Sequence, residues 1–97
     1  MTDERINQVL ECGFRYAKYK LCLRKNRIKD DPNTADFKDL VNGLLGEVRE
    51  LTIAIDRALL LEYSDVSLNE IALEAADVIN YAAMLCDLTE HVGQKIK

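Results

Sequence analysis

Hydrophobic side chains recur along this chain at the three- and four-residue spacing of α-helices, and no stretch alternates for long as a β-strand would. The first such stretch begins at Thr2 or Asp3 and is predicted to end near Asn26. Its apolar face contains Ile6, Val9, Leu10, Gly13, Phe14, Ala17 and Leu21, beside a second row of Cys12, Tyr16, Tyr19 and Leu23. We therefore expect an amphipathic first helix.

A second helix is predicted from about Ala35 to about Glu62, after a loop around Pro32. Proline has no N–H and disfavours helix in the residue before it. Asn33 or Thr34 is then a suitable N-cap for the second helix. Its apolar residues fall within roughly a third of the helix circumference at ~100° per residue. They are Phe37, Leu40, Val41, Leu44, Val48, Leu51, Ile55, Ala58 and Leu59.

A third helix follows a short turn at residues 63–66. Ser67 and Glu70 form a capping box at its start, and Gly93 is its predicted end. Between residues 71 and 85 apolar and small side chains point in nearly every direction, which is the pattern of a buried helix. Two other helices of this length cannot enclose it. We therefore predict an all-α fold, an antiparallel bundle of three main helices completed by oligomerisation.

Composition narrows the class of protein. The 97 residues suit one domain, spanning residues 1–97, and no apolar run approaches the ~20 residues of a membrane span. The net charge of −4 argues against a general nucleic-acid-binding protein. Cys12, Cys22 and Cys86 are far apart and are expected to be reduced, mostly buried thiols. With a polar N-terminus unlike a signal peptide, these features predict a cytoplasmic domain without nucleic-acid or membrane partners.

Three polar residues interrupt the apolar third helix: Glu74, Asp77 and Asn80. Their spacing places them in one row, where they can act together. A buried carboxylate is destabilising unless it is paired, protonated or bound to a metal. A second acidic pair, Glu47 and Glu50, lies beside the apolar face of the second helix. If the two helices are antiparallel neighbours, the two acidic pairs lie at the same position along the helix axes to within about two turns.

Gly43 and Ala54 lie on the same side of the second helix as Glu47 and are expected to leave open space beside the acids. Four carboxylates without a His or Cys ligand describe a site for a hard cation, Mg²⁺ or, as a substitute, Mn²⁺. Magnesium commonly shares its ligand shell with substrate phosphates. On the residues alone the alternative stays open, since each short acidic motif is more often a solvated helix face.

The two motifs, Glu47-Val48-Arg49-Glu50 and Glu74-Ala75-Ala76-Asp77, are separated by 23 residues. In this order and setting they resemble the ExxE and ExxD motifs of the MazG-like, all-α nucleoside triphosphate pyrophosphohydrolase family. The hydrophobic context ADVINY is similar as well, and the resemblance covers essentially the whole chain. Family members often have an acidic residue where this chain has Gly46, so the number of metal ions is left open.

The resemblance implies Mg²⁺-dependent hydrolysis of (d)NTPs between the α- and β-phosphates, giving a nucleoside monophosphate and pyrophosphate. Removal of unwanted nucleotides from the pool is one purpose such an activity serves. Glu47, Glu50, Glu74 and Asp77 would hold the metal, and Glu47 or Glu50 would accept a proton from water. The resemblance also implies a homodimer or a dimer of dimers.

Substrate-binding residues are expected on the first and third helices. Residues 15–29 contain seven of the thirteen basic residues and no acid, and Arg15 and Lys18 are the candidates for binding phosphates. The candidates for a base slot are Phe14, Tyr16, Tyr19 and Tyr81, and the candidate for a sugar or phosphate contact is Asn80. For Arg15 and Lys18 the alternative is a solvated helix face, and for the aromatic residues and Asn80 it is a place in the core.

Two further hypotheses remain from the sequence. A deoxyuridine nucleotide hydrolase or a phosphoribosyl-ATP hydrolase would share the metal site. A non-enzymatic helical dimerisation or regulatory module would instead use the acids structurally, paired with Arg49 or Arg57 across the dimer. Turnover of nucleotides separates the enzymes from the module.

Overall fold

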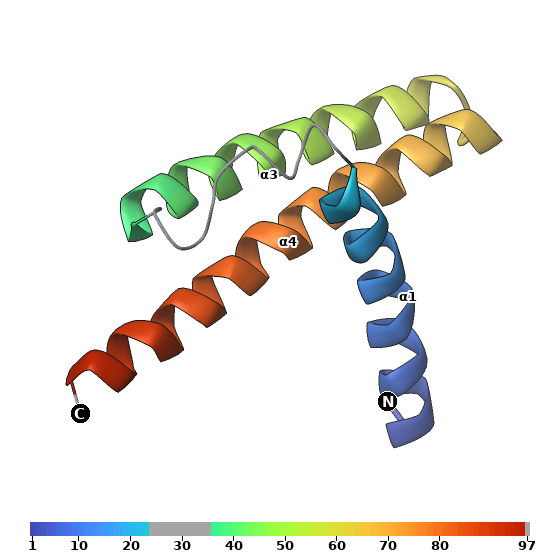
Figure 1. The fold of residues 1–97 in the computed structure, drawn as a ribbon. Helices are drawn as coiled ribbons and strands as arrows, with labels where there is room; N and C mark the ends of the chain where they lie inside the picture. The colour runs from blue at the N-terminus through green and yellow to red at the C-terminus, as the bar shows by residue number, and fades with distance from the viewer. Residues whose placement is uncertain (24–35, 97) are drawn as a thin grey trace.

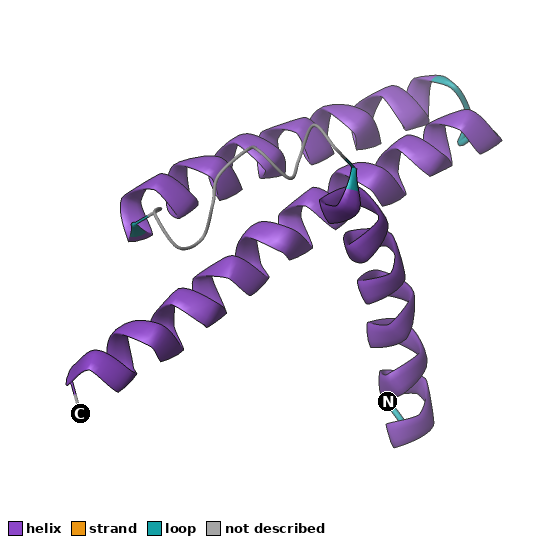
Figure 2. Cartoon of the chain, in the orientation of Figure 1, coloured by secondary structure: helices purple, strands orange, loops and turns teal. Residues whose placement is uncertain are grey.

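The structure, a computed structural model, describes residues 1–23 and 36–96 of the chain. Three helices account for nearly all of them: α1 (Asp3–Cys22), α3 (Phe37–Leu60) and α4 (Asp65–Ile96). These ranges contain no β-strand (Figure 2), so the predicted all-α class is confirmed. None of the described helices combines the length and the apolar character needed to cross a membrane.

Helices α3 and α4 lie side by side and run in opposite directions as a helical hairpin (Figure 1). Helix α1 crosses α4 and extends away from the hairpin. Within the described residues the backbone of α1 approaches α4 but not α3. Two of the three helices therefore have the predicted antiparallel arrangement, whereas one chain by itself does not form the complete bundle.

The start of α1 agrees with the sequence, and its end does not. The Thr2 side chain accepts a hydrogen bond from the Arg5 backbone N–H at 3.1 Å and so caps the helix. At the other end Leu23 has an extended backbone, and α1 ends at Cys22. The helix therefore stops before its predicted end near Asn26, a residue outside the described part of the chain.

Helix α3 begins with a reciprocal capping box. The Asp36 carboxylate accepts a hydrogen bond from the Asp39 backbone N–H at 2.8 Å, and the Asp39 carboxylate accepts one from the Asp36 N–H at 3.3 Å. The predicted caps, Asn33 and Thr34, lie outside the described residues. Because Asp36 caps the helix, the prediction placed its start too early.

The turn between α3 and α4 occupies residues 61–64. Glu62 and Tyr63 have φ angles of 52° and 54° there. This left-handed conformation costs about 1–2 kcal/mol for each residue other than glycine that adopts it. The Ser64 hydroxyl oxygen accepts a hydrogen bond from the Ser67 N–H at 3.3 Å and so caps α4. Ser67, the predicted cap, is buried inside the helix. The turn therefore comes two residues earlier than predicted.

Helix α4 is longer and less enclosed than the sequence suggested. It continues through Gly93 to Ile96, so the predicted stop at Gly93 is wrong. Between residues 71 and 80 only Ala76 is buried, and the other side chains are half-buried. The prediction of a helix buried on all sides is therefore not met by a single chain.

The core of the chain is small. The buried apolar residues among those described are Ala17, Leu40, Ala54, Ala58, Ala76 and Tyr81. Large apolar side chains stay exposed on every helix, among them Phe14, Leu45, Ile53, Leu59, Leu60 and Leu68. The accessible surface is 7520 Å², about 1,900 Å² more than the roughly 5,600 Å² expected of a compact monomer of this mass. The radius of gyration, 15.2 Å, likewise exceeds the ~12.5 Å of a compact chain.

The three cysteines lie at the surface of the chain. Cys12, Cys22 and Cys86 are all exposed, so the prediction of their burial is wrong. The position of α1 explains this for Cys12 and Cys22, because α1 packs on α4 alone and leaves most of its circumference uncovered.

Candidate metal centre

Four carboxylates meet where α3 packs on α4. One carboxylate oxygen from each of Glu47, Glu50, Glu74 and Asp77 lies within 4.8 Å of the others. Each helix supplies one pair of acids spaced by three residues, which places both members on the same side of their helix. The structure therefore brings together the four acids that the sequence singled out, in a group able to hold a metal ion.

The early turn explains why the acids meet at one level. Carboxylate oxygens of Glu50 on α3 and Glu74 on α4 lie within 4.8 Å of each other. Nearer the turn, Arg57 Nη1 lies 3.4 Å from Glu70 Oε2. In the hairpin closed by residues 61–64, Glu50 is therefore opposite Glu74. The two acidic pairs lie side by side along the helices, without the difference of about two turns that the sequence allowed.

Burial and mutual repulsion raise the pKa of Glu74 above its ordinary value. Burial is the largest cause, followed by the negative charge of Glu50, the hydrogen bond with Glu50 and the charge of Asp77, while Lys20 acts in the opposite direction. Glu74 Oε2 is buried and has no hydrogen-bond partner among the described residues. Glu47 is 7% exposed. A divalent cation would offset this repulsion, and an oxygen-only ligand set fits Mg²⁺.

Helix α1 adds a positive charge that the sequence analysis did not select. Lys20 Nζ lies 3.1 Å from Asp77 Oδ2, and the two side chains are 12% and 17% exposed. A signal for Lys20 was present, because it follows Gly13 and Ala17 at helical spacing on the small-residue side of α1. That side faces α4, where a Cβ at Gly13 would lie 3.3 Å from Ile79 Cδ1.

Asn80 holds α1 against α4. Its side-chain amide donates a hydrogen bond to the Ala17 backbone carbonyl oxygen at 2.9 Å, and its side chain is half-buried. Ala17 is one turn before Lys20, so this bond fixes the part of α1 that reaches the acids. The structural role left open for Asn80 is thus observed, and its contact with a sugar or phosphate stays a prediction.

Tyr81 of α4 packs against Gly43 of α3. A Cβ at Gly43 would overlap the Tyr81 ring, and Ala54 is buried as well. The prediction that Gly43 and Ala54 leave open space beside the acids is therefore wrong, because α4 fills it. Tyr81 is 7% exposed and so is a core residue of the hairpin, while its contact with substrate stays a prediction.

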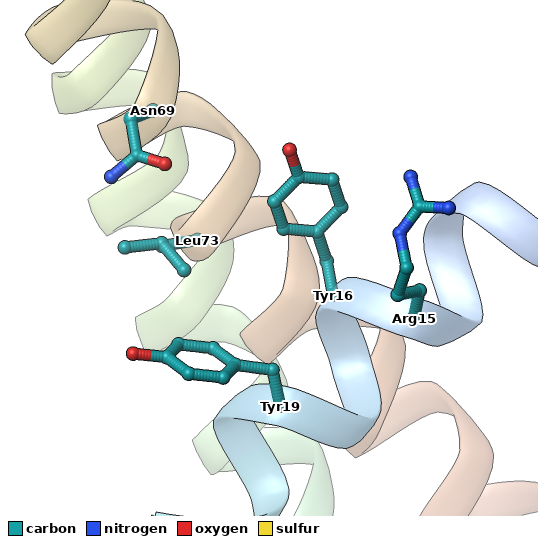
Figure 3. A pocket seen from close by; sticks show the side chains of 5 residues that line it. All are labelled: Arg15, Tyr16, Tyr19, Asn69 and Leu73. Carbon is teal, nitrogen blue, oxygen red and sulfur yellow. The ribbon is translucent and has the colours of Figure 1, made fainter.

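A hollow of about 390 Å³ lies between α1 and the first part of α4. Its lining residues are Arg15, Tyr16, Tyr19, Asn69 and Leu73. Both tyrosine rings project from α1 toward Asn69 and Leu73, with Arg15 beside Tyr16 (Figure 3). The Arg15 guanidinium carbon is 5.9 Å from the centre of the Tyr16 ring. Tyr19 and Leu73 immediately precede Lys20 and Glu74 in the sequence, but none of the four acids is among the residues that line the hollow.

The remaining candidates lie away from this hollow. Phe14 is exposed and is not among its lining residues. Lys18 lines a second, more open hollow of about 470 Å³ with Arg15, Tyr19, Cys22 and Leu23. Sequence reasoning missed Asn69 and Leu73, because it did not establish which part of α4 faces the tyrosines.

Three positions, Gly46, Arg49 and Arg57, bear on the number of metal ions and on the non-enzymatic alternative. Gly46, where the resembled family often has an acid, is exposed, and a Cβ there would meet nothing within 4 Å. Arg57, a proposed structural partner of the acids, lies 3.4 Å from Glu70 of the same chain. Arg49 is exposed. Arg57 therefore has a partner outside the group of four acids.

Comparisons of the chain with models of protein families, with curated proteins and with solved structures give no match. The class of protein is therefore defined by fold and site alone. It is an all-α protein in which four carboxylates from two antiparallel helices form a group able to hold a metal ion.

Proposed function

We propose that this protein is a Mg²⁺-dependent nucleoside triphosphate pyrophosphohydrolase. The observation that supports this most is the convergence of Glu47, Glu50, Glu74 and Asp77 within 4.8 Å. A buried oxygen of Glu74 without a hydrogen-bond partner among the described residues adds a position that a cation would satisfy. The resemblance to the MazG-like family connects such a site with nucleotide chemistry.

Glu47, Glu50, Glu74 and Asp77 would hold the ion, which polarises phosphoryl oxygens and lowers the pKa of water when it is bound. Glu50 is the exposed member of the four, whereas Glu47 is buried. An exposed carboxylate is better placed to exchange protons with water and solvent. We therefore assign the general base to Glu50, which would be the least engaged of the four ligands, and a ligand role alone to Glu47.

The reaction breaks one phosphoanhydride bond. The water oxygen attacks the α-phosphorus, and the bond from that phosphorus to the bridging oxygen breaks. Pyrophosphate leaves with the bonding electrons, one proton of the water passes to Glu50, and the other stays on the oxygen added to the α-phosphorus. The products are a nucleoside monophosphate and pyrophosphate, and the protein ends unchanged once Glu50 returns its proton to solvent.

The hollow between α1 and α4 is the proposed nucleoside site. Its volume, about 390 Å³, lies in the usual range for small-molecule sites. The rings of Tyr16 and Tyr19 provide flat apolar surface for a base. The Asn69 amide offers both a donor and an acceptor for a base edge, and Arg15 adds a positive charge. Phe14 and Lys18 are outside this site and remain weaker candidates.

We infer that two copies of the chain complete the bundle. The surface in excess of a compact monomer, about 1,900 Å² per chain, is of the size buried in stable dimers. Burying the half-exposed middle of α4 against a second copy would also satisfy the apolar pattern of residues 71–85. A dimer of dimers is compatible with the same surfaces.

Product analysis tests the function. The protein is incubated with a panel of NTPs and dNTPs, including dUTP, and with phosphoribosyl-ATP, each with Mg²⁺ and with EDTA. We expect a nucleoside monophosphate and pyrophosphate from at least one triphosphate, only with Mg²⁺. Release of a diphosphate and orthophosphate would contradict cleavage at the α-phosphorus. Absence of turnover by a folded, dimeric protein would favour the non-enzymatic dimerisation module.

A further inference from the structure

Lys20 reaches the acids from outside the hairpin that builds them. Its ammonium is 3.1 Å from Asp77 Oδ2, and both side chains are largely buried. A charged group that is largely removed from water is stable only with a close partner of opposite charge. The position of the ammonium is therefore determined by the carboxylates that would also bind a divalent cation.

Lys20 and a metal ion would compete for the same charge. The charge of Lys20 counteracts the effects of Glu50 and Asp77 on Glu74, so its influence extends beyond Asp77. Because like charges repel strongly in a partly buried site, a divalent ion bound to Asp77 would displace the ammonium from that carboxylate. The displaced ammonium then needs another anion nearby.

The rest of α1 does not have to move for this exchange. The Asn80 amide bond to the Ala17 carbonyl and the close approach of Gly13 to Ile79 hold the helix on α4. The flexible four-carbon stem of a lysine lets its ammonium swing between partners, and lysine is a common phosphate ligand. Only the Lys20 side chain therefore has to change position.

We propose that Lys20 is a phosphate-binding residue that exchanges partners: it pairs with Asp77 in the metal-free protein and binds a substrate phosphate oxygen once a divalent ion occupies the acids. This inference rests on the proposed function and adds a residue to the same site. It requires that Lys20 oppose metal binding when phosphate is absent and favour phosphate binding when the metal is present. A purely structural ion pair would produce neither effect.

Calorimetric titrations of wild type and Lys20→Met test the exchange, with Mg²⁺ alone as the first probe and pyrophosphate at saturating Mg²⁺ as the second. We expect Lys20→Met to bind Mg²⁺ about 3–10-fold more tightly, since a competing charge is gone. It should bind pyrophosphate at least about tenfold more weakly, since a charge-assisted hydrogen bond is lost. Lys38→Met on α3, which is exposed, removes the same charge elsewhere and should change neither affinity by more than about twofold.

Two further variants keep the test informative if Lys20→Met folds poorly. Lys20→Gln removes the charge but retains a polar side chain and should shift both affinities in the same directions. Lys20→Arg retains the charge and should remain near wild type in Mg²⁺ binding. Weaker Mg²⁺ binding by the neutral variants, or unchanged binding of both probes, would overturn the exchange.

The outcomes also separate this inference from the proposed function. Nucleotide hydrolysis by the wild type together with unchanged affinities in Lys20→Met would overturn the role of Lys20 alone. Opposite shifts in the two affinities without hydrolysis of any nucleotide would support the exchange and contradict the enzyme.

Discussion

The ring of Tyr81 on α4 fills the space that a side chain at Gly43 on α3 would occupy. Gly43 is one turn before Glu47, and Tyr81 is one turn after Asp77. This contact therefore sets how closely the two helices approach beside the acids. It links the packing of the hairpin directly to the geometry of the candidate metal centre.

Gly43→Ala is expected to destabilise the protein by about 1–3 kcal/mol, because the added methyl group displaces the Tyr81 ring. Gly46→Ala is the matched control, since a Cβ there meets nothing within 4 Å and the helix gains about 0.5–1 kcal/mol from alanine. Urea unfolding measures both. Equal stability of the two variants would contradict the observed packing.

The raised pKa of Glu74 predicts how stability varies with pH when no divalent ion is present. Because its folded-state pKa is above the unfolded value, the folded protein binds more protons between the two values, and stability falls as pH rises through that window. Glu74→Gln should remove this fall and exceed wild type in stability above the window. Unfolding free energies measured in EDTA across this pH range provide the check. Glu70→Gln should keep the wild-type dependence of the unfolding free energy on pH. The same dependence in Glu74→Gln would contradict Glu74 as its source.

Magnesium should stabilise the folded protein, because the four acids come together only in the folded state. At a hundredfold excess over its Kd, a ligand adds about 2.7 kcal/mol, which raises the melting temperature by about 4–8 °C for each kcal/mol in a domain of this size. Asp77→Asn and Glu47→Gln should lose most of this increase, while the exposed control Asp56→Asn should retain it. A melting temperature that does not respond to millimolar Mg²⁺ would argue against the metal site.

Asn69→Ala tests the nucleoside site. Losing a hydrogen bond to the base should raise KM by about 5–10-fold with a smaller change in kcat, since Asn69 lines the hollow and is not one of the four acids. Asn42→Ala, an exposed asparagine of α3, should behave as wild type. Steady-state kinetics with the preferred triphosphate measures both KM values. Equal KM values for the two variants would contradict binding of the base in this hollow.

The sequence predicted that the four acids meet, because helical spacing fixes which residues of a helix share a side. The sequence predicted less well which residues of α3 lie opposite which residues of α4. The reason is the turn, where Glu62 and Tyr63 adopt a conformation that usually requires glycine. The predicted end of the third helix at Gly93 was wrong for a different reason, because a helix tolerates an interior glycine at a cost of about 1 kcal/mol.

The parts that were missed depend on contacts between helices. Periodicity identifies the apolar side of α1, but it does not say that Asn80 bonds to the Ala17 carbonyl. That contact places Lys20 at the acids and brings Tyr16 opposite Asn69. The relative position of α1 and α4 is a tertiary feature, and the hollow and the ion pair both follow from it.

The most direct test of the account is pyrophosphate release from the preferred triphosphate by wild type, Glu50→Gln and Asp77→Asn at saturating Mg²⁺. We expect release by wild type and a loss of at least about 100-fold in Glu50→Gln, with a comparable loss in Asp77→Asn, which removes a metal ligand. Glu70→Gln, an exchange of the same kind one turn before Glu74, should retain activity. Undiminished release by folded Glu50→Gln and Asp77→Asn would contradict hydrolysis at the four-carboxylate site.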